Sequence, residues 1–336
     1  MSLALIQQCY EKVATGGSLT VAEAEGLIAL EGTAVVDLMA AANRLRHQFK
    51  GDAIHLCSIV NTKSGGCTED CSFCSQASRY ATGVANYGLL SSAEVVRAAD
   101  EAAKNGAQAF GVVAAWRGLK EGPVLDAVCE QISEIAARGD LHADASLGLI
   151  DSPGVARRLK EAGLHCYNHN LETAPSFFGE ICQTHGYEDR LTTLRHVRAA
   201  GIRICCGGIL GMGESPAQRV ELAFALKEVA PDMVPMNFLD PQPGTPLAGR
   251  PTMAPMEILK TIAVFRFVLP DRNIMVAGGR ERGLGSLQPL MFLAGASATM
   301  TGNYLTTVGN PPAADHAMIE ALGLTWSPGE PVPVSL

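Results

Sequence analysis

The residues best suited to chemistry lie in one loop, SGGCTEDCSFCSQASRY at 64–80, which holds Cys67, Cys71 and Cys74 in the spacing CxxxCxxC. The loop directly follows a strand-like run, HLCSIV at 55–60. Thiolates are soft ligands that suit zinc or an iron–sulfur cluster. A closed zinc site would need a fourth ligand at short spacing, and the loop offers none. Three cysteines on a [4Fe–4S] cube leave one iron open to an outside ligand, so the loop predicts such a cluster.

The composition limits where and on what the chain acts. Its 336 residues are 47% hydrophobic and 18% charged, which is ordinary for a globular protein with a large core. The net charge of −8, without a basic run, argues against nucleic-acid or anionic-membrane partners. No apolar run approaches the roughly 18 residues of a membrane span, and the start MSLALIQQCYEKVATGG lacks the cationic region of a signal peptide. We therefore expect a cytoplasmic protein, in which the ten cysteines are reduced and serve as ligands or small buried hydrophobes.

Short β-rich runs alternate with amphipathic segments from His55 onward. Eight such alternations in roughly 250 residues predict a parallel sheet, most economically a (βα)8 barrel. A doubly wound open sheet is the competing fold, but GGILGMGE at 207–214 does not fit the GxGxxG of a dinucleotide loop. The predicted strands are 55–60, 108–115, 142–147, 164–170, 202–210, 232–238, 273–277 and 296–300; the predicted helices lie near 91–105, 123–139, 153–162, 187–200, 214–229, 255–269 and 285–293.

Three regions are expected along the chain. Residues 1–50 form a helical extension on the outside or the floor of the barrel, and 51–310 form the barrel. Residues 311–336 form a final helix and a loose tail, GEPVPVSL.

A three-cysteine loop ahead of a barrel resembles the radical S-adenosylmethionine enzymes. The resemblance implies that S-adenosylmethionine chelates the free iron through its amino and carboxylate groups. It also implies that the cluster supplies the electron that splits the cofactor into a 5′-deoxyadenosyl radical. Phe73, between the last two cysteines, is the aromatic residue often found there in that superfamily.

Further motifs resemble biotin synthase in the order that family has them. This resemblance implies sulfur insertion into dethiobiotin, with one deoxyadenosyl radical for each of two C–H bonds, a flavodoxin or ferredoxin electron donor, and a homodimer. The motifs are NTKSGGCTEDCSFCSQASRYATG from residue 61, AAW at 114–116, CYNHNLET at 166–173, CCGGILGMGE at 205–214, VPMNFL at 234–239, GTPL at 244–247, GGRE at 278–281 and YLTT at 304–307.

The same resemblance implies residue roles. Ala115 and Trp116 would lie beside the cofactor, and Asn170, Glu172 and Arg190 would bind its ribose and amino acid portion. The substrate's ureido ring would meet Asn168, Asn170 and Asn237, and its carboxylate Thr306 and Thr307. Taken singly, each asparagine could instead cap a turn or strand end, although Asn168 and Asn170 share one face of a strand.

The chain departs from the family at its second cluster. Familiar biotin synthases hold a [2Fe–2S] cluster, the sulfur source, with three cysteines and an arginine. Cys205 and Arg280 match that set, but the other two positions are Gly111 and Asp144. Glycine has no ligand atom, and a carboxylate is a hard ligand for a sulfide cluster.

Other thiols could build a different auxiliary cluster. Cys57, Cys166 and Cys205 could converge inside the barrel with Arg280 above them, as in a variant class of biotin synthase with a larger, sulfide-carrying cluster. Cys206 is an alternative ligand, although adjacent strand residues point to opposite faces and only one of the pair should line the interior. The simpler interpretation is that these cysteines are buried hydrophobes. Cys9, Cys129 and Cys182 are expected to be structural or incidental.

Two other functions remain open from the sequence. One is a sister radical enzyme of the same barrel, of the hydrogenase-maturase or methylornithine-synthase type, which inserts no sulfur. The other is a non-catalytic protein with an iron–sulfur or zinc clip.

Overall fold

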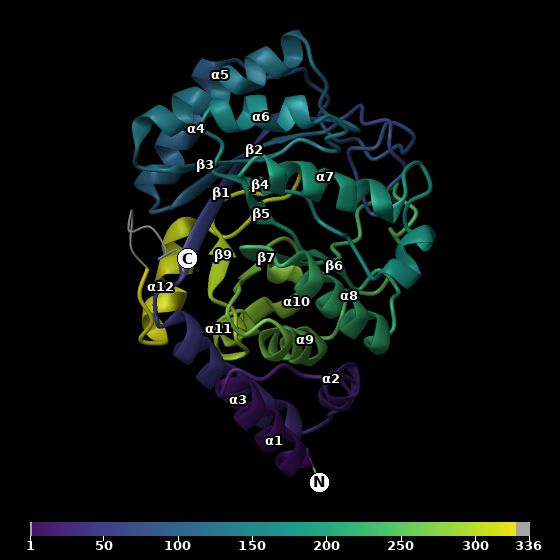
Figure 1. The fold of residues 1–336 in the computed structure, drawn as a ribbon, viewed down its shortest axis with the longest axis vertical. Helices are drawn as coiled ribbons and strands as arrows, with labels where there is room; N and C mark the ends of the chain where they lie inside the picture. Colours follow the sequence, from purple (N-terminus) through teal and green to yellow (C-terminus); the bar gives the residue numbers. More distant parts are fainter. Residues whose placement is uncertain (1, 327–336) are drawn as a thin grey trace.

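The fold is a closed barrel of parallel strands surrounded by helices, as a computed structural model describes it for residues 2–326 (Figure 1). The strand order is β5-β4-β3-β2-β1-β9-β8-β7-β6, and β5 also pairs with β7, which closes the ring. Every pairing in the ring is parallel. The predicted (βα)8 barrel is confirmed. The strands are β1 His55–Lys63, β2 Ala109–Ala114, β3 His142–Ser146, β4 Cys166–Asn168, β5 Arg203–Cys205, β6 Gly208–Leu210, β7 Met233–Phe238, β8 Asn273–Val276 and β9 Ala298–Met300.

The nine strands occupy eight positions around the barrel, because the predicted strand 202–210 is broken into β5 and β6. The break lies at Cys206 and Gly207, where the backbone of Pro235 crosses very closely. A Cβ atom on Gly207 would lie 1.8 Å from the carbonyl oxygen of Pro235, so only glycine fits there.

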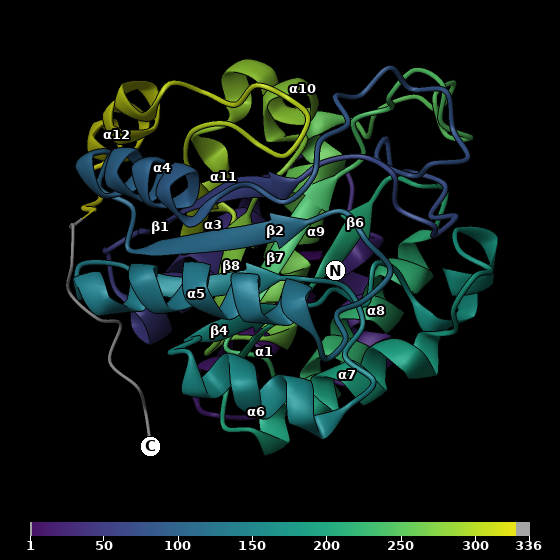
Figure 2. The same cartoon turned by 90° about the horizontal axis from the view of Figure 1, so that it is seen from above.

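The helices that follow the strands lie on the outside of the barrel (Figures 1 and 2). Several begin with a capping residue: Ser91 accepts a hydrogen bond from the backbone of Glu94 in a capping box, and Ser152 caps the helix that begins at Pro153. These helices are α4 Ser92–Lys104, α5 Pro123–Arg138, α6 Pro153–Glu161, α7 Tyr187–Ala199, α8 Pro216–Val229, α9 Pro255–Val268 and α12 Pro312–Ala321, with a 3-10 helix η1 at Pro175–Glu180.

The first fifty residues form three helices on the outside of the barrel, not on its floor. They are α1 Ser2–Ala14, α2 Val21–Ile28 and α3 Ala34–Lys50, and they pack against α8 and α9. Figure 1 shows them in purple below α9. The ammonium of Lys260, on α9, donates a hydrogen bond to the carbonyl of Leu30 over 3.1 Å, which ties the extension to the barrel.

One predicted helix is wrong as a continuous element. The segment 285–293 is divided into the 3-10 helix η2 Gly285–Leu287 and the short α11 Leu290–Leu293, after α10 Arg280–Leu284. Gly285 adopts a positive φ of 51° and Pro289 cannot donate to a helix ladder, so neither residue continues a helix. The predicted tail at 329–336 lies outside the described residues. Among the described helices, none has the length and apolar character needed to cross a membrane.

Candidate active site

The three-cysteine loop begins at the carboxyl end of β1, where barrel enzymes carry their chemistry. Cys67 and Cys71 are buried, Cys74 is half-buried, and all three line one cavity. Gln76 holds the start of the loop, because its Oε1 accepts hydrogen bonds from Asn61 Nδ2 at 3.0 Å and from the Gly65 amide at 3.2 Å.

The thiols of this loop fit a metal cluster. Burial raises the pKa of Cys67, and it raises the pKa of Cys74 to about 11, so both thiols need a nearby positive centre to ionise at neutral pH. A bound metal centre deprotonates a coordinating thiol outright. Three convergent thiols, two of them buried and one half-buried, suit a [4Fe–4S] cluster that supplies the positive centre they need to ionise.

A carboxylate and a guanidinium face the same cavity, Glu172 from the segment after β4 and Arg190 from α7. Arg190 Nη1 donates to Glu172 Oε1 over 3.1 Å and to the carbonyl of Asn170 over 2.8 Å. The other carboxylate oxygen, Glu172 Oε2, and the guanidinium Nε of Arg190 are buried without a partner among the described residues. An unused acceptor beside an unused donor fits the amino and carboxylate groups of an amino acid.

The backbone at Glu172 is strained. Its φ is 69°, and of the described residues other than glycine only Ala230 shares a positive φ. Such strain costs of the order of 1–3 kcal/mol and is typical of functional sites.

The remaining residues expected near the cofactor line this cavity. Phe73, Ala115, Trp116, Asn168 and Asn170 all contribute to its wall. The Trp116 indole donates to the carbonyl of Leu147 over 2.7 Å, which fixes the ring. Asn170 also has the structural role considered for it, since its Oδ1 accepts from the Gly207 amide over 3.1 Å.

The other residues expected to contact the substrate, Asn237, Thr306 and Thr307, do not line this cavity or the second cavity described below. Asn237 donates to the carbonyl of Gly208 over 3.2 Å and accepts from the Gly278 amide over 3.0 Å, so backbone groups occupy its amide. Thr306 shares a 3.2 Å hydrogen bond with Ser75, next to the last cysteine of the loop. Thr307 uses its carbonyl to accept from the Tyr304 amide over 3.0 Å.

A second cavity lies deeper in the barrel, and its wall brings together Cys57, Cys166 and Cys205. The three thiols come from β1, β4 and β5 and are all buried. The cavity has a volume of about 100 Å³, whereas a water molecule needs about 15 Å³. It is therefore large enough for a multi-atom group, and thiols with Met233, Met275 and Met300 give it a soft-donor lining.

Gly111 and Asp144, the two departures from the familiar ligand set, line this second cavity as well. The strand register pairs Gly111 with Asp144, and Asp144 with Cys166. Asp144 Oδ1 is buried without a partner, and burial raises the pKa of this carboxyl to about 8. Cys166 thus lies in the same row of the barrel wall as Gly111 and Asp144, whereas Cys57 pairs with Ala109 and Cys205 with Asn168.

Two of the expected auxiliary ligands lie elsewhere. Cys206 is fully buried in the layer between the barrel and its helices, on the opposite face from Cys205, so it is removed from the candidates. The Arg280 guanidinium does not line the cavity. It bonds to Asp315 over 2.7 Å, to the carbonyl of Met300 over 3.1 Å and to Gln288 over 3.0 Å.

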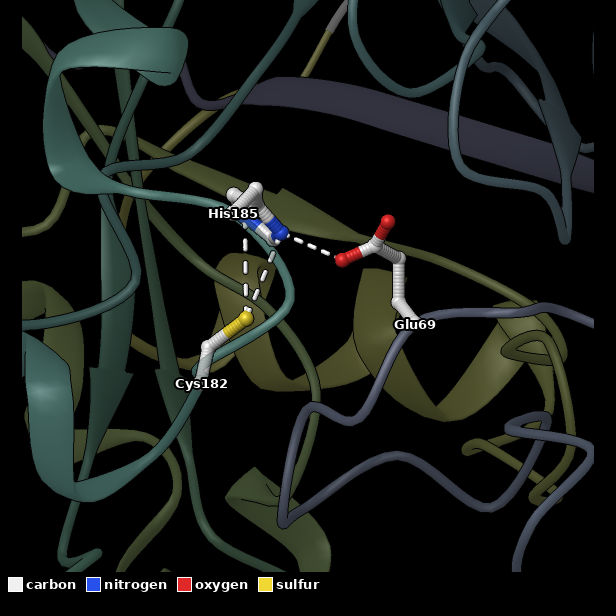
Figure 3. Close-up of side chains that lie close together, drawn as sticks. All are labelled: Glu69, Cys182 and His185. Carbon is white, nitrogen blue, oxygen red and sulfur yellow. Dashed lines mark hydrogen bonds and ion pairs between the residues drawn. The ribbon is translucent and has the colours of Figure 1, made fainter.

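One group beside the first cavity was not predicted from the sequence. Cys182 was expected to be structural or incidental, yet its Sγ lies 4.0 Å from Cys71 Sγ. The same sulfur lies 3.3 Å from His185 Nδ1 (Figure 3). The only signal in the sequence is the CxxH spacing in CQTH at 182–185.

Family models indicate the class of the protein, and solved structures show the same fold. Residues 61–226 match the radical SAM superfamily, and residues 235–325 match the biotin and thiamin synthesis associated domain. Methylornithine synthase has the same fold, with a TM-score of 0.80 and 21% identity, covering 96% of this chain and 97% of that one. The hydrogenase maturase HydG superposes with a TM-score of 0.82 and 16% identity, covering 98% of this chain and 76% of that one. The chain is therefore a radical S-adenosylmethionine enzyme.

Curated relatives narrow the class to one family. The biotin synthase of Geobacter sulfurreducens is 48% identical over 314 residues, covering 94% of this chain and 95% of that relative. The biotin synthase of Trichlorobacter lovleyi is 48% identical over 309 residues, covering 92% of each. The chain belongs to the biotin synthase family, whose members use a [4Fe–4S] cluster, S-adenosylmethionine and an auxiliary iron–sulfur cluster.

Proposed function

We propose that the chain converts dethiobiotin to biotin and takes the sulfur from an auxiliary cluster held by Cys57, Cys166 and Cys205. The observation that carries this proposal is the convergence of three thiols from three strands on one cavity beneath the radical-generating site. The bound cluster and S-adenosylmethionine supply the radicals that break two C–H bonds. The chain's own residues hold the reactants and exclude water.

The residues at the mouth of the barrel support the binding of the cofactor. Cys67, Cys71 and Cys74 would hold the first cluster, with Phe73 against it. Glu172 and Arg190 would take the charged groups of S-adenosylmethionine through the two unpartnered atoms described above. Ala115 and Trp116 would form the wall against its adenosyl portion.

The deeper cavity supports a sulfur donor other than a familiar [2Fe–2S] cluster. A glycine and a protonated carboxyl stand where cysteines would be needed, while Cys57 and Cys166 add thiols at other positions of the same cavity. Asn168 lies between the two cavities, so substrate held there would have the radical source on one side and the sulfur source on the other.

Several partners remain predictions from the sequence. These are the flavodoxin or ferredoxin electron donor, the homodimer, the cytoplasmic location and the absence of nucleic-acid and membrane partners. Arg280 is left out of the proposed ligand set, because Asp315 and Gln288 already engage it.

An anaerobic turnover assay of the Cys166→Ala variant tests the proposal. With dethiobiotin, S-adenosylmethionine and a reductant, we expect the wild-type chain to form biotin. The variant should still release 5′-deoxyadenosine but form no biotin, because only the sulfur source is lost.

The matched control is Cys129→Ala, which replaces a half-buried thiol on α5 whose Sγ lies 3.8 Å from the carbonyl of Arg158. It should form biotin at the wild-type rate. Normal biotin formation by Cys166→Ala would make that thiol a packing residue. Deoxyadenosine without biotin in the wild type would instead favour a sister enzyme that inserts no sulfur.

A further inference from the structure

The deeper cavity continues past its three thiols to the amino ends of the barrel strands. Its wall at that level consists of polar side chains that stand at the first position of a strand or directly before it. These floor residues are His55 on β1, His142 on β3, His165 before β4, Arg203 on β5, Asp232 before β7 and Asn273 on β8. The interior of a (βα)8 barrel is ordinarily packed with branched aliphatic side chains. A polar cavity at the amino end is therefore a departure that packing does not explain.

The floor residues are held in place and still offer hydrogen-bond donors. Arg203 Nε pairs with Asp232 Oδ1 over 3.1 Å, and its Nη1 lies 3.4 Å from His165 Nε2. The rings of His142 and His165 stack with their centroids 4.0 Å apart. His55 Nδ1 is buried without a partner among the described residues. A guanidinium has five N–H donors, and an imidazole has at least one whether it is neutral or protonated, so the floor suits a small anion.

The charges around the floor also favour an anion over a metal ion. Lys50 Nζ donates to the carbonyl of Asp271, two residues before β8, over 3.3 Å. Burial and then the charge of Arg266 lower the pKa of Lys50 to about 8, and Arg203 acts in the same direction, so several cations lie near one another here. Among the described residues, no floor histidine belongs to a group of three His, Cys, Asp or Glu side chains whose donor atoms lie within 4.8 Å of one another.

The two ends of the deeper cavity lead to different places. Val113, Ser146 and Asn168 line both cavities, so a group that enters from the mouth must pass the positions proposed for S-adenosylmethionine and dethiobiotin. At the floor, the side chains of Arg203 and Asp232 are 30% and 36% exposed, and the N-terminal helices pack against α8 and α9 instead of covering this end. The floor therefore gives access to the cavity while the mouth is occupied.

We propose that the floor residues bind hydrosulfide and admit it to the deeper cavity, which resupplies the sulfur source from the amino end of the barrel. Each biotin removes one sulfur atom, so the source must be refilled between turnovers. Delivery needs neither oxidant nor reductant, because sulfur has the same formal oxidation state in hydrosulfide, in a cluster sulfide and in a thioether. The inference rests on the proposed function, which places the sulfur source in this cavity.

An anaerobic isotope experiment on the cluster-loaded enzyme tests the inference. The enzyme first forms biotin from its own sulfur and then receives sulfide of a heavy sulfur isotope with fresh dethiobiotin and S-adenosylmethionine. Mass spectrometry should find light biotin first and heavy biotin second in the wild type. Arg203→Gln and His165→Phe should form light biotin as the wild type does, while the rate of heavy biotin formation falls several-fold. Phenylalanine keeps the ring stack on His142 but donates no hydrogen bond.

Two further variants separate an entry route from damage to the fold. His316→Phe is the matched control and should behave as the wild type, because His316 stacks on Trp326 with centroids 3.6 Å apart, on α12 outside the barrel. Asp232→Asn removes the negative partner of Arg203. The sulfide concentration that gives half the maximal rate of heavy biotin formation should therefore fall roughly two- to fivefold. Damage to the fold would not lower it.

Bromide gives a readout that does not depend on activity, because it resembles hydrosulfide in charge and size and is located by anomalous scattering. In crystals of the cluster-loaded enzyme soaked in bromide, we expect the ion within hydrogen-bond distance of Arg203, and we expect that site to be empty in Arg203→Gln. An adventitious ion only, bound alike to both proteins, would contradict a binding site at the floor.

The outcomes distinguish failure of the entry route from failure of the proposed function. Light biotin without heavy biotin in the wild type, or equal rates of heavy biotin formation in all variants, would overturn the entry route alone. Absence of light biotin from the wild type would overturn the proposed function and the inference with it. If Arg203→Gln and His165→Phe lose light biotin as well, Asp232→Asn decides, and an unchanged or higher sulfide requirement overturns the entry route.

Discussion

Asn168 donates a hydrogen bond from its Nδ2 to the Sγ of Cys205 across 3.4 Å, and its side chain lines both cavities of the barrel. The carboxyl end of β4 thus joins the wall of the radical site to a thiol of the deeper sulfur site. The resemblance to biotin synthase implied a substrate role for Asn168, and this contact adds a role toward the second cavity.

Replacing Asn168 should uncouple cleavage of S-adenosylmethionine from the formation of biotin. In Asn168→Ala, we expect 5′-deoxyadenosine to form at near the wild-type rate while the biotin formed per deoxyadenosine falls several-fold. The reason is that Cys205 loses its hydrogen bond and the substrate loses a polar contact, each of roughly 1 kcal/mol. Quantifying both products in one anaerobic assay measures the ratio. An unchanged ratio would contradict the role of Asn168 at both cavities.

Replacing Glu172 should weaken binding of S-adenosylmethionine. Glu172→Gln removes the charge that Arg190 pairs with and that the cofactor's amino group would meet, so affinity should fall roughly ten- to hundredfold. Equilibrium dialysis of the cluster-loaded enzyme with radiolabelled cofactor measures it. The matched control is Glu188→Gln on α7, whose carboxylate is 70% exposed and pairs only with an exposed arginine. Equal affinities in all three proteins would rule out contact between Glu172 and the cofactor.

The N-terminal helices should respond to acid through Glu23. A hydrogen bond from Lys12, then one from the Thr20 backbone, lowers the pKa of Glu23 from 4.5 to about 2. Between these values the unfolded chain binds more protons, so stability rises with pH in that window. The contribution is complete above about pH 4.5 and is lost as the pH falls through about 2.

Comparison of Glu23→Gln with wild type checks this dependence. The variant should unfold at a lower temperature at pH 6, and the difference should shrink steadily between pH 4.5 and pH 3. Salt should weaken the difference, because Lys12 is about one-third exposed. A difference that is constant from pH 6 to pH 3 would show that the Glu23 charge contributes nothing.

The sequence predicts the barrel well because its signals are local and repeated. Capping residues such as Ser91 and Ser152 mark the starts of helices. The spacing of the three cysteines in the loop Cys67–Cys74 predicts a [4Fe–4S] cluster without knowledge of the rest of the fold. The break between β5 and β6 could not be predicted, because it depends on the Pro235 carbonyl meeting Gly207 from another strand. The broken segment at 285–293 was within reach, since Gly285 and Pro289 both argue against a helix.

In the candidate site, too, local features of the sequence are predictable and contacts between distant residues are not. Parity along a strand predicts that Cys205 and Cys206 face opposite sides. It cannot predict that Arg280 bonds to Asp315, which lies 35 residues further on in α12. Cys182 was missed for a related reason, since its importance comes from its 4.0 Å approach to Cys71, which is 111 residues away in the chain.

Metal analysis of anaerobically purified protein tests the central claim most directly, namely that Cys57, Cys166 and Cys205 hold an auxiliary cluster in the deeper cavity. A chain with two four-iron clusters should contain about eight irons and at least about eight sulfides, and a Cys57→Ala, Cys166→Ala, Cys205→Ala triple variant about four of each. Cys129→Ala should match the wild type. About four irons in the wild type, or no loss in the triple variant, would contradict the auxiliary cluster at these thiols.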